Sequence, residues 1–189
     1  MTTSATTTRT RISTRRSEAV QVALALGGNV PGTDGPVERT LNLALRRLEE
    51  VLGPLRVASL YRTAAVSPVP QPDYLNTAVL ANASLEPGEL LALAKALEMA
   101  AGRRRGERFG PRPLDIDLLL YGDLQSSAPE LTLPHPRLRE RRFVLEPLAE
   151  IAPDLQIPPD NAKVSALLAR LQPEPLVLRV GSLDYGKGP

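Results

Sequence analysis

The chain has 189 residues, of which 42% are hydrophobic and 23% are charged, a composition typical of a globular protein. It contains no cysteine, which excludes disulfides, thiolate metal sites and a cysteine nucleophile, and it has no apolar run near the roughly 20 residues that a membrane-spanning helix needs. The net charge of +2 comes from residues 1–17, which hold four arginines and no acid, so 19 basic side chains face 21 acidic ones in the rest. A generally basic nucleic-acid-binding surface is therefore not expected.

Three segments follow from the distribution of apolar residues. Residues 1–17 are Thr, Ser and Arg with almost nothing apolar, and they predict a disordered tail. An Arg- and Ser-rich start without acids also fits an organelle transit peptide, although it has no convincing amphipathic stripe. Residues 18–172 predict one domain, and the proline-rich residues 173–189 form a C-terminal tail that the pattern does not place. Because no secretion signal is visible, a cytoplasmic location is expected.

Hydrophobic periodicity and turn residues predict the elements along the chain. In chain order they are a strand at 20–26, a helix at 36–52, strands at 55–61 and 74–85, a helix at 87–101, a strand at 114–121, a short strand at 131–133, and amphipathic pieces near 139–148 and 164–171. The order βαββαβ is that of the α+β, ferredoxin-like fold, an antiparallel sheet with two helices on one face. The other face is then left for loops and ligand.

The strand at 114–121 carries the strongest chemical signal. Asp115 and Asp117 share one strand face because side chains alternate, while Leu114, Ile116, Leu118 and Leu120 take the opposite face. Two neighbouring carboxylates repel each other and require a cation. An arginine pair is one candidate, and magnesium held together with substrate phosphates is the other. Under the magnesium hypothesis, the free protein keeps two unneutralised carboxylates.

Two arginine clusters flank this strand, at 103–112 and 137–142. One or two arginines after a helix fit the helix dipole, but five in ten positions with only Glu107 as counter-charge indicate an anion-binding loop. His135 is the only histidine, so a zinc triad is not expected. Beside the second cluster, His135 can donate to phosphate.

A third signal comes from side chains suited to a flat heterocycle. Tyr74, Phe109 and Phe143 lie in polar blocks rather than in core-like runs, and together they can clamp such a ring by stacking. Asn76 shares a strand face with Tyr74 and offers a donor and an acceptor. Packing remains the alternative for each aromatic residue taken singly.

Five segments in order resemble the 6-hydroxymethyl-7,8-dihydropterin pyrophosphokinase family, over about residues 20–158. They are ALGGNV at 25–30, SLYRTAAV at 59–66, QPDYLNTAV at 71–79, GRRRGERFGPRPLDIDLLLYGD at 102–123 and LTLPHPRLRERRFVLEPLAEIAPDL at 131–155. The resemblance implies the ferredoxin-like fold and transfer of the β,γ-diphosphate of ATP to a pterin hydroxymethyl group, leaving AMP. One departure is Gly28, where the family usually has Ser.

The resemblance also implies roles for individual residues. Two magnesium ions would bridge ATP to Asp115 and Asp117, and Arg103 and Arg112 match catalytic arginines. The pterin contacts implied are Thr63, Ala64, Val66, Tyr74, Asn76 and Phe143; the nucleotide contacts implied are Glu98, Arg105, Phe109, Leu118, Thr132, His135 and Arg141. The partners expected are therefore ATP and the reduced pterin, with no nucleic acid and no membrane, for a monomeric enzyme.

Two rival functions stay open. One is another Asp-x-Asp phosphotransferase on the same scaffold, and the other is a non-catalytic anion- or nucleic-acid-binding module that uses the arginine clusters. The nucleotide motifs of other classes are missing, because no lysine follows a Gly-x-x-x-x-Gly pattern and Gly27-Gly28-Asn29 is not a dinucleotide fingerprint.

Overall fold

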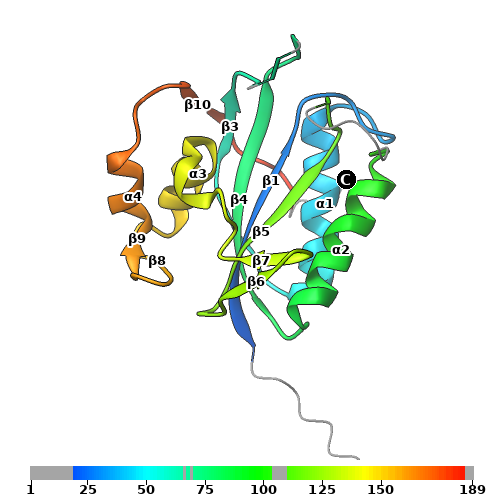
Figure 1. The fold of residues 1–189 in the computed structure, drawn as a ribbon. Helices are drawn as coiled ribbons and strands as arrows, with labels where there is room; N and C mark the ends of the chain where they lie inside the picture. Colours follow the sequence, from blue (N-terminus) through cyan, green and yellow to red (C-terminus); the bar gives the residue numbers. More distant parts are fainter. Residues whose placement is uncertain (1–18, 66, 69, 104–109, 186–189) are drawn as a thin grey trace, which may run out of the picture.

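A computed structural model describes residues 19–65, 67–68, 70–103 and 110–185, in which an antiparallel sheet lies between two layers of helices (Figure 1). The sheet strands are β1 (Val20–Gly28), β2 (Arg56–Val57), β3 (Leu60–Thr63), β4 (Tyr74–Ala83), β5 (Asp115–Tyr121) and β10 (Val177–Gly181). Their order is β10–β3–β4–β1–β5, with β2 also paired to β4. Two hairpins, β6 (Ser126–Ala128) with β7 (Leu131–Leu133) and β8 (Gln156–Ile157) with β9 (Ala162–Lys163), lie outside it.

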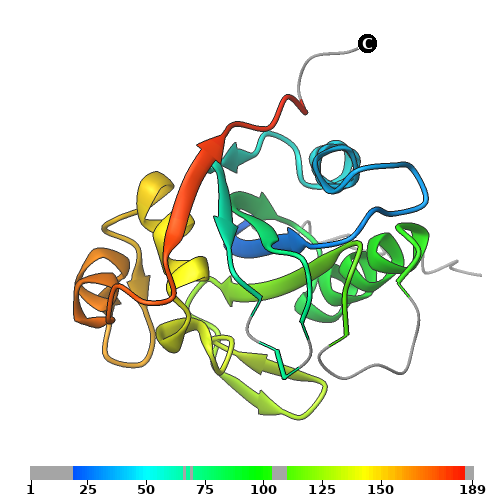
Figure 2. The same cartoon turned by 90° about the horizontal axis from the view of Figure 1, so that it is seen from above.

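The first face of the sheet is covered by α1 (Val37–Leu52) and α2 (Pro87–Ala100), as Figure 2 shows from above. The helical spacing of apolar residues in α1 puts Leu41, Leu45 and Leu48 on one buried stripe. They pack on inward side chains of β1, β4 and β5 in one continuous core. α1 ends before Gly53, which has a positive φ of 78°. The sequence predicted the end of the helix at this glycine. The ferredoxin-like arrangement is thus the observed fold.

The second face carries helices as well as the expected loops. The segment from Leu138 to Ile151 forms a 3₁₀ turn, η1 (Leu138–Glu140), and α3 (Arg142–Ile151), and α4 (Val164–Arg170) packs beside α3. Val144, Leu145 and Leu148 are fully buried in a second core that includes Ala78 and Leu80 of β4. Ligand space on this face is therefore confined to the part that α3 leaves uncovered.

The strand expected at 55–61 is split into β2 and β3. Between them the Ser59 backbone N–H donates to the Glu150 carboxylate of α3 at 2.8 Å rather than to a neighbouring strand. The carbonyl of Ala58 accepts the Thr77 hydroxyl at 3.0 Å. Long-range side-chain partners thus interrupt the ladder, and the local sequence carries no sign of them.

Strand alternation fails at one position of β5. The register with β1 shifts between Ala23–Leu120 and Leu24–Leu118, so Leu119 is an extra residue on β5. Leu120 was expected beside Leu118 on the α1/α2 face, and this expectation was wrong, because the bulge turns Leu120 into the second core. Asp115 and Asp117 precede the bulge and keep their common face.

Candidate active site

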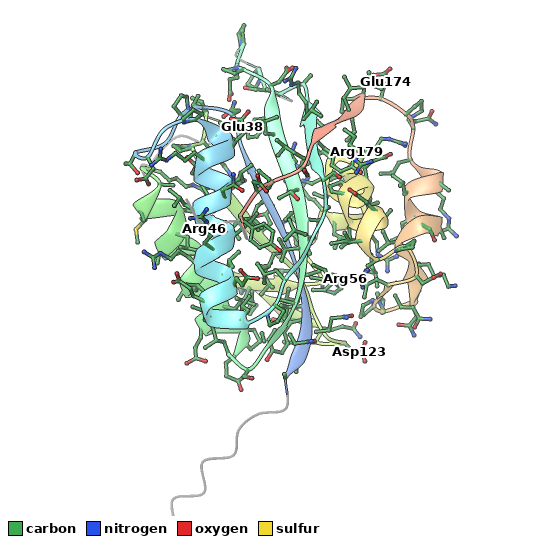
Figure 3. The ribbon with its side chains drawn as sticks, turned by 180° about the vertical axis from the view of Figure 1, so that it is seen from behind. Glu38, Arg46, Arg56, Asp123, Glu174 and Arg179 are labelled. Atoms are coloured by element: carbon green, nitrogen blue, oxygen red, sulfur yellow. The ribbon has the colours of Figure 1, made fainter. Side chains whose placement is uncertain are left out.

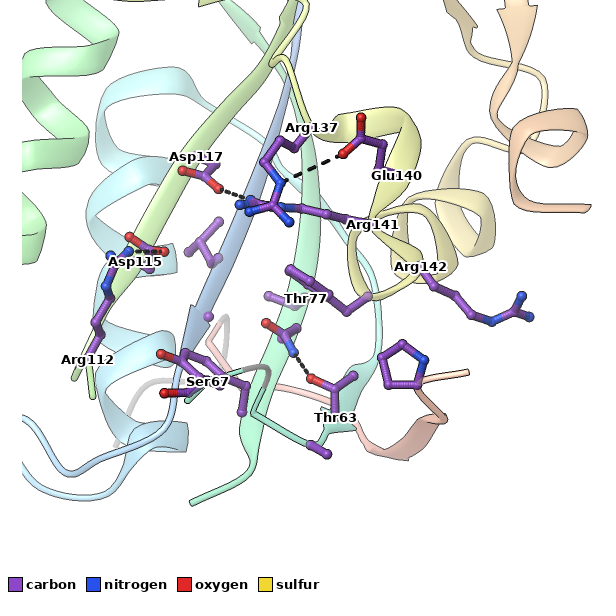
Figure 4. Close-up of a pocket in the computed structure, with 18 of the residues that line it drawn as sticks. Thr63, Ser67, Thr77, Arg112, Asp115, Asp117, Arg137, Glu140, Arg141 and Arg142 are labelled. Atoms are coloured by element: carbon purple, nitrogen blue, oxygen red, sulfur yellow. Dashed lines mark hydrogen bonds and ion pairs between the residues drawn. The ribbon is translucent and has the colours of Figure 1, made fainter. Parts of the chain in front are cut away.

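The carboxylates of Asp115 and Asp117 line a cavity of about 560 Å³ on the second face of the sheet (Figure 4). Between them Ile116 points the other way into the first core, as alternation requires. The two acids belong to β5, at one edge of the sheet. The cavity extends from there across β1 to β4 and the end of β3. It places the acid pair and the polar end of β3 in one space.

Arginines from both clusters neutralise the two acids. Arg103 Nη1 lies 2.6 Å from Asp115 Oδ1 and Arg112 Nη1 lies 2.7 Å from Asp115 Oδ2. Arg141 Nη1 lies 3.1 Å from Asp117 Oδ2. The expectation of unneutralised carboxylates in the free protein was therefore wrong: guanidinium groups supply the counter-charge. All five side chains keep between a fifth and a third of their surface exposed, so incoming anions can reach these arginines.

Glu98 connects the end of α2 to the acid pair from behind. Its side chain is nearly buried, with Oε1 accepting the Ile116 backbone N–H at 2.8 Å, and it also contacts Arg103. Burial raises the pKa of Glu98 above its ordinary value, partly opposed by that hydrogen bond and by the Arg103 charge. Glu98 therefore fixes the backbone between the two aspartates and holds the guanidinium that faces Asp115.

His135 stands beside Asp117 as a neutral donor. Its backbone N–H donates to the Leu119 carbonyl at 2.9 Å, and its Nδ1 accepts the Arg137 backbone N–H at 3.2 Å. The ring hydrogen therefore belongs on Nε2, which lies 3.8 Å from Asp117 Oδ2. Burial lowers the pKa of His135, partly opposed by the negative charge of Asp117 and assisted by the positive charges of Arg141 and Arg137. The imidazole presents an N–H toward Asp117, although His135 itself does not line the cavity.

Away from the acids, the cavity is lined by an amide and a hydroxyl of β4 and β3. Asn76 on β4 is buried and donates from Nδ2 to Thr63 Oγ1 at 2.9 Å. Tyr74, Ala64 and Phe143 line the same cavity, and the Arg141 guanidinium lies 5.5 Å from the Phe143 ring centre. Gly27 makes room here, because a Cβ on it would lie 2.6 Å from Asn76 Oδ1.

The sequence pattern assigns no role to Asn29, but in the structure its side chain connects two loops. Its Nδ2 donates to Gln71 Oε1 and to the Pro72 carbonyl, both at 3.1 Å. Its Oδ1 accepts the Arg112 backbone N–H at 2.8 Å. Asn29 thereby joins the loop before β4 to the loop before β5. Its position after a strand that ends in Gly-Gly was the one available signal.

Several expected contacts do not line the cavity. Leu118 points into the first core, and Thr132, on β7, donates its hydroxyl to the Ala128 carbonyl at 3.1 Å. Val66, Arg105 and Phe109 lie outside the described residues. Gly28 permits a close approach of the backbone at Pro113, because a Cβ on Gly28 would lie 2.4 Å from the Pro113 carbonyl oxygen. Other lining residues, including Thr77, Arg142 and Pro175, were not expected.

Among the described residues, none of the helices has the length and apolar character needed to cross a membrane.

Curated proteins resemble the chain over most of its length. It is 45% identical over 150 residues to 2-amino-4-hydroxy-6-hydroxymethyldihydropteridine pyrophosphokinase of Synechocystis sp., covering 78% of this chain and 74% of that protein. It is 38% identical to the protein of the same name from Pseudomonas aeruginosa, covering 79% and 90%.

Longer proteins match in part. The chain is 42% identical to the mitochondrial folate synthesis bifunctional protein of Arabidopsis thaliana over 69% of this chain, but it spans 23% of that protein. The crystal structure of a Plasmodium falciparum HPPK-DHPS triple mutant with pteroate aligns with a TM-score of 0.64 at 14% identity, over 83% of this chain and 44% of that one, which shows a likeness of fold. The family described as 7,8-dihydro-6-hydroxymethylpterin-pyrophosphokinase matches residues 23–153, well over half of the chain. By that match and by the identity to its bacterial members, the chain belongs to the 7,8-dihydro-6-hydroxymethylpterin-pyrophosphokinase (HPPK) family.

Proposed function

We propose that the chain transfers the β,γ-diphosphate of ATP to the hydroxymethyl oxygen of 6-hydroxymethyl-7,8-dihydropterin, with magnesium, as a step of folate biosynthesis. The observation that carries this proposal is the division of one cavity into two chemically distinct ends. Carboxylates and arginines lie at the β5 end, and an amide, a hydroxyl and aromatic rings lie toward β3 and β4. Membership of the HPPK family and the names of its bacterial relatives support the same reaction.

The β5 end suits the triphosphate. Asp115 and Asp117 fit magnesium, which binds through one or two carboxylates and completes its ligands with water and substrate phosphates. The described residues hold no group of three or more His, Asp or Glu side chains placed to bind a metal ion. In this proposal, the two acids bind magnesium that arrives with ATP. Two ions held there would offset the phosphate charge.

The arginines supply the rest of the charge stabilisation. In the free protein Arg103, Arg112 and Arg141 pair with the two acids. If Asp115 and Asp117 held magnesium, these guanidinium groups would be available for phosphate oxygens, which guanidinium can bind through two parallel hydrogen bonds. His135 adds an uncharged donor beside them. The site thus exchanges internal ion pairs for contacts with substrate.

The other end suits the pterin. Tyr74 and Phe143 offer rings for stacking, and the buried Asn76–Thr63 pair and the backbone at Ala64 offer hydrogen bonds to a heterocycle edge. We include Val66, Arg105 and Phe109, which lie outside the described residues, among the proposed substrate contacts on the family resemblance alone.

The chemical step then needs positioning more than covalent help. The pterin hydroxyl oxygen attacks the β-phosphorus of ATP, the bond from that phosphorus to the α–β bridging oxygen breaks, and AMP leaves while the hydroxyl proton passes to solvent. Arginines at 103, 112 and 141 stabilise the negative charge that moves to the leaving oxygen.

Product identification tests the proposal. The chain is incubated with ATP, magnesium and 6-hydroxymethyl-7,8-dihydropterin, and AMP and the pterin diphosphate are expected in equal amounts. ADP with a pterin monophosphate would contradict the proposal and favour a different phosphotransferase. Consumption of neither substrate, combined with retention of nucleic acid at physiological salt, would favour the binding module.

We further propose a monomer that acts in the cytoplasm. Light scattering of the purified chain tests the first point. Imaging of a fluorescent fusion with and without residues 1–17 tests the second, and organelle targeting that depends on these residues would establish the transit-peptide alternative.

A further inference from the structure

The last strand of the sheet lies beyond the family match and still reaches the pterin end of the cavity. The match ends at residue 153, whereas β10 pairs antiparallel with β3, with Val177 opposite Thr63 and Arg179 opposite Tyr61. Thr63 is the last residue of β3 and holds the Asn76 amide. The ladder therefore fixes the backbone at the point where the chain enters the loop that lines the cavity.

Two residues of this segment contact the site from different positions. Pro175, before the strand, lines the cavity. Arg179, within β10, donates from Nε to Ser59 Oγ at 2.7 Å and lies 3.5 Å from Glu150 Oε1. Leu178 points to the other side and is 49% exposed. Figure 3 labels Arg179 at β10, which is an edge strand of the sheet.

The connection from α4 to β10 also contacts the helix that carries Phe143. Arg142 Nη1 lies 3.4 Å from the carbonyl oxygens of both Leu171 and Gln172. Arg142 begins α3, and its neighbour Phe143 lines the cavity. The segment thus contacts both walls of the pterin end, β3 on one side and the first turn of α3 on the other.

We infer that residues 171–181 form a positioning element for the pterin, which fixes the backbone around Thr63 through β10 and adds Pro175 to the lining of the cavity. This inference rests on the proposed function. It predicts an effect on one substrate only, because β10 and β5 lie at opposite edges of the sheet. Loss of β10 should weaken the binding of the pterin and leave the binding of ATP, at the β5 end, unchanged.

Two truncated chains isolate the strand. A chain that ends after Gln172 lacks β10, and a chain that ends after Gly181 keeps it. Both lose Tyr185, whose hydroxyl donates to the Leu55 carbonyl at 3.3 Å and whose carbonyl accepts Arg46 Nε. Both chains lack the residues after Gly181, so they differ only in residues 173–181, which include Pro175 and β10. The readouts are KM for the pterin, KM for ATP, and the dissociation constant of the pterin by calorimetry.

The chain ending after Gln172 should show a pterin KM and dissociation constant raised by about tenfold or more, since small displacements of positioning groups are costly. Its KM for ATP should stay within about twofold, a free-energy change below 0.5 kcal/mol, and the longer chain should match the full-length protein. Equal pterin affinity in the two truncated chains would overturn the inference, as would a parallel rise of both KM values.

If the shorter chain does not unfold cooperatively, a milder variant tests the role of residues 171–181. The double change Pro175→Gly with Arg179→Ala keeps the whole chain, and Leu178→Ala on the opposite side of the same strand is its control. The double variant should raise pterin KM by about threefold or more, and the control should not change it. An unchanged pterin KM in the double variant would overturn the inference. If the full-length protein itself makes no pterin diphosphate, the proposed function fails first, and that outcome is separate.

Discussion

Asp115 and Asp117 are each ion-paired to arginine in the free protein. The proposed function gives each a second role, as a magnesium ligand when ATP binds. Because the paired side chains keep a fifth to a third of their surface exposed, these ion pairs contribute modestly to folding. The proposed exchange of partners at the arginines would therefore cost the fold little.

Replacement of either acid by its amide separates these roles. Asp115→Asn or Asp117→Asn should lower kcat by at least about a hundredfold, because charge stabilisation by a metal is worth several kcal/mol. The free energy of unfolding without ligand should change by less than about 1 kcal/mol. Steady-state rates and thermal unfolding check both, with Asp123→Asn, in the exposed turn after β5, as control. Destabilisation by roughly 3–5 kcal/mol with normal magnesium dependence would make the pair structural.

The arginines of Asp115 make a kinetic prediction. Arg103→Ala and Arg112→Ala should lower kcat far more than they raise the dissociation constant of ATP, since only contacts that strengthen in the transition state accelerate the reaction. Single-turnover rates and ATP binding by calorimetry separate the two quantities. Arg47→Ala, which removes an exposed ion pair on α1, serves as the control. Weak ATP binding with an intact kcat would reduce both arginines to ordinary phosphate contacts.

At the scale of elements, a carboxylate joins α3 to β3. Glu150 accepts the Ser59 backbone N–H, the Ser59 hydroxyl and the Tyr61 hydroxyl, at 2.8, 2.7 and 2.9 Å. Partial burial opposes its ionisation, but these hydrogen bonds and the charge of Arg179 outweigh it, so the pKa of Glu150 lies below its ordinary value. Burial and the Glu150 acceptor raise the pKa of Tyr61 to about 12.

These shifts fix a pH window for stability. A lowered carboxyl pKa contributes stability above pH 4.5, the ordinary value, which is lost as pH falls through the lowered pKa. A raised tyrosine pKa contributes stability below pH 10, which is lost as pH rises toward about 12. Glu150→Gln should cost about 1–3 kcal/mol inside this window and progressively less on either side. Chemical denaturation at several pH values measures it, with Glu50→Gln in an exposed pair as control; a cost independent of pH would contradict the assignment.

Local rules predicted some of these elements and missed others for physical reasons. Alternation placed Asp115 and Asp117 on one face, and helical spacing placed the leucines of α1 in the core. The break between β2 and β3 depends on Glu150, which is 91 residues away from Ser59, and the strand β10 depends on the free edge of β3. Pairings between distant segments leave no periodic trace in either partner, so they were missed.

For the site, residue chemistry predicted more than local geometry did. The two acids, Arg112, Arg141 and Asn76 line one cavity, and Arg103 pairs with Asp115 without lining it. The bulge at Leu119 and the joining role of Asn29, in contrast, needed the folded partners. Glu98 was expected through family resemblance, and its hydrogen bond to the backbone of Ile116 could not be read from spacing.

For the whole molecule, the sequence makes one prediction about residues 1–17, which lie outside the described residues. They carry no apolar anchor, so their deletion should leave activity within about twofold and stability within about 0.5 kcal/mol, as for changes remote from a core or site. Rates and melting curves of the shortened chain check this. A large loss of pterin turnover would give the segment a working role.

In the proposed function, one cavity holds phosphates at the β5 edge and the pterin toward β3. Calorimetry of Asp117→Asn and Asn76→Ala tests this division through the dissociation constants of ATP and of the pterin. Asp117→Asn should lose magnesium-dependent ATP affinity and keep its affinity for the pterin, while Asn76→Ala should weaken pterin binding by about tenfold and bind ATP as before. If Asn76→Ala weakened ATP binding and left pterin binding unchanged, the two ends would be wrongly assigned.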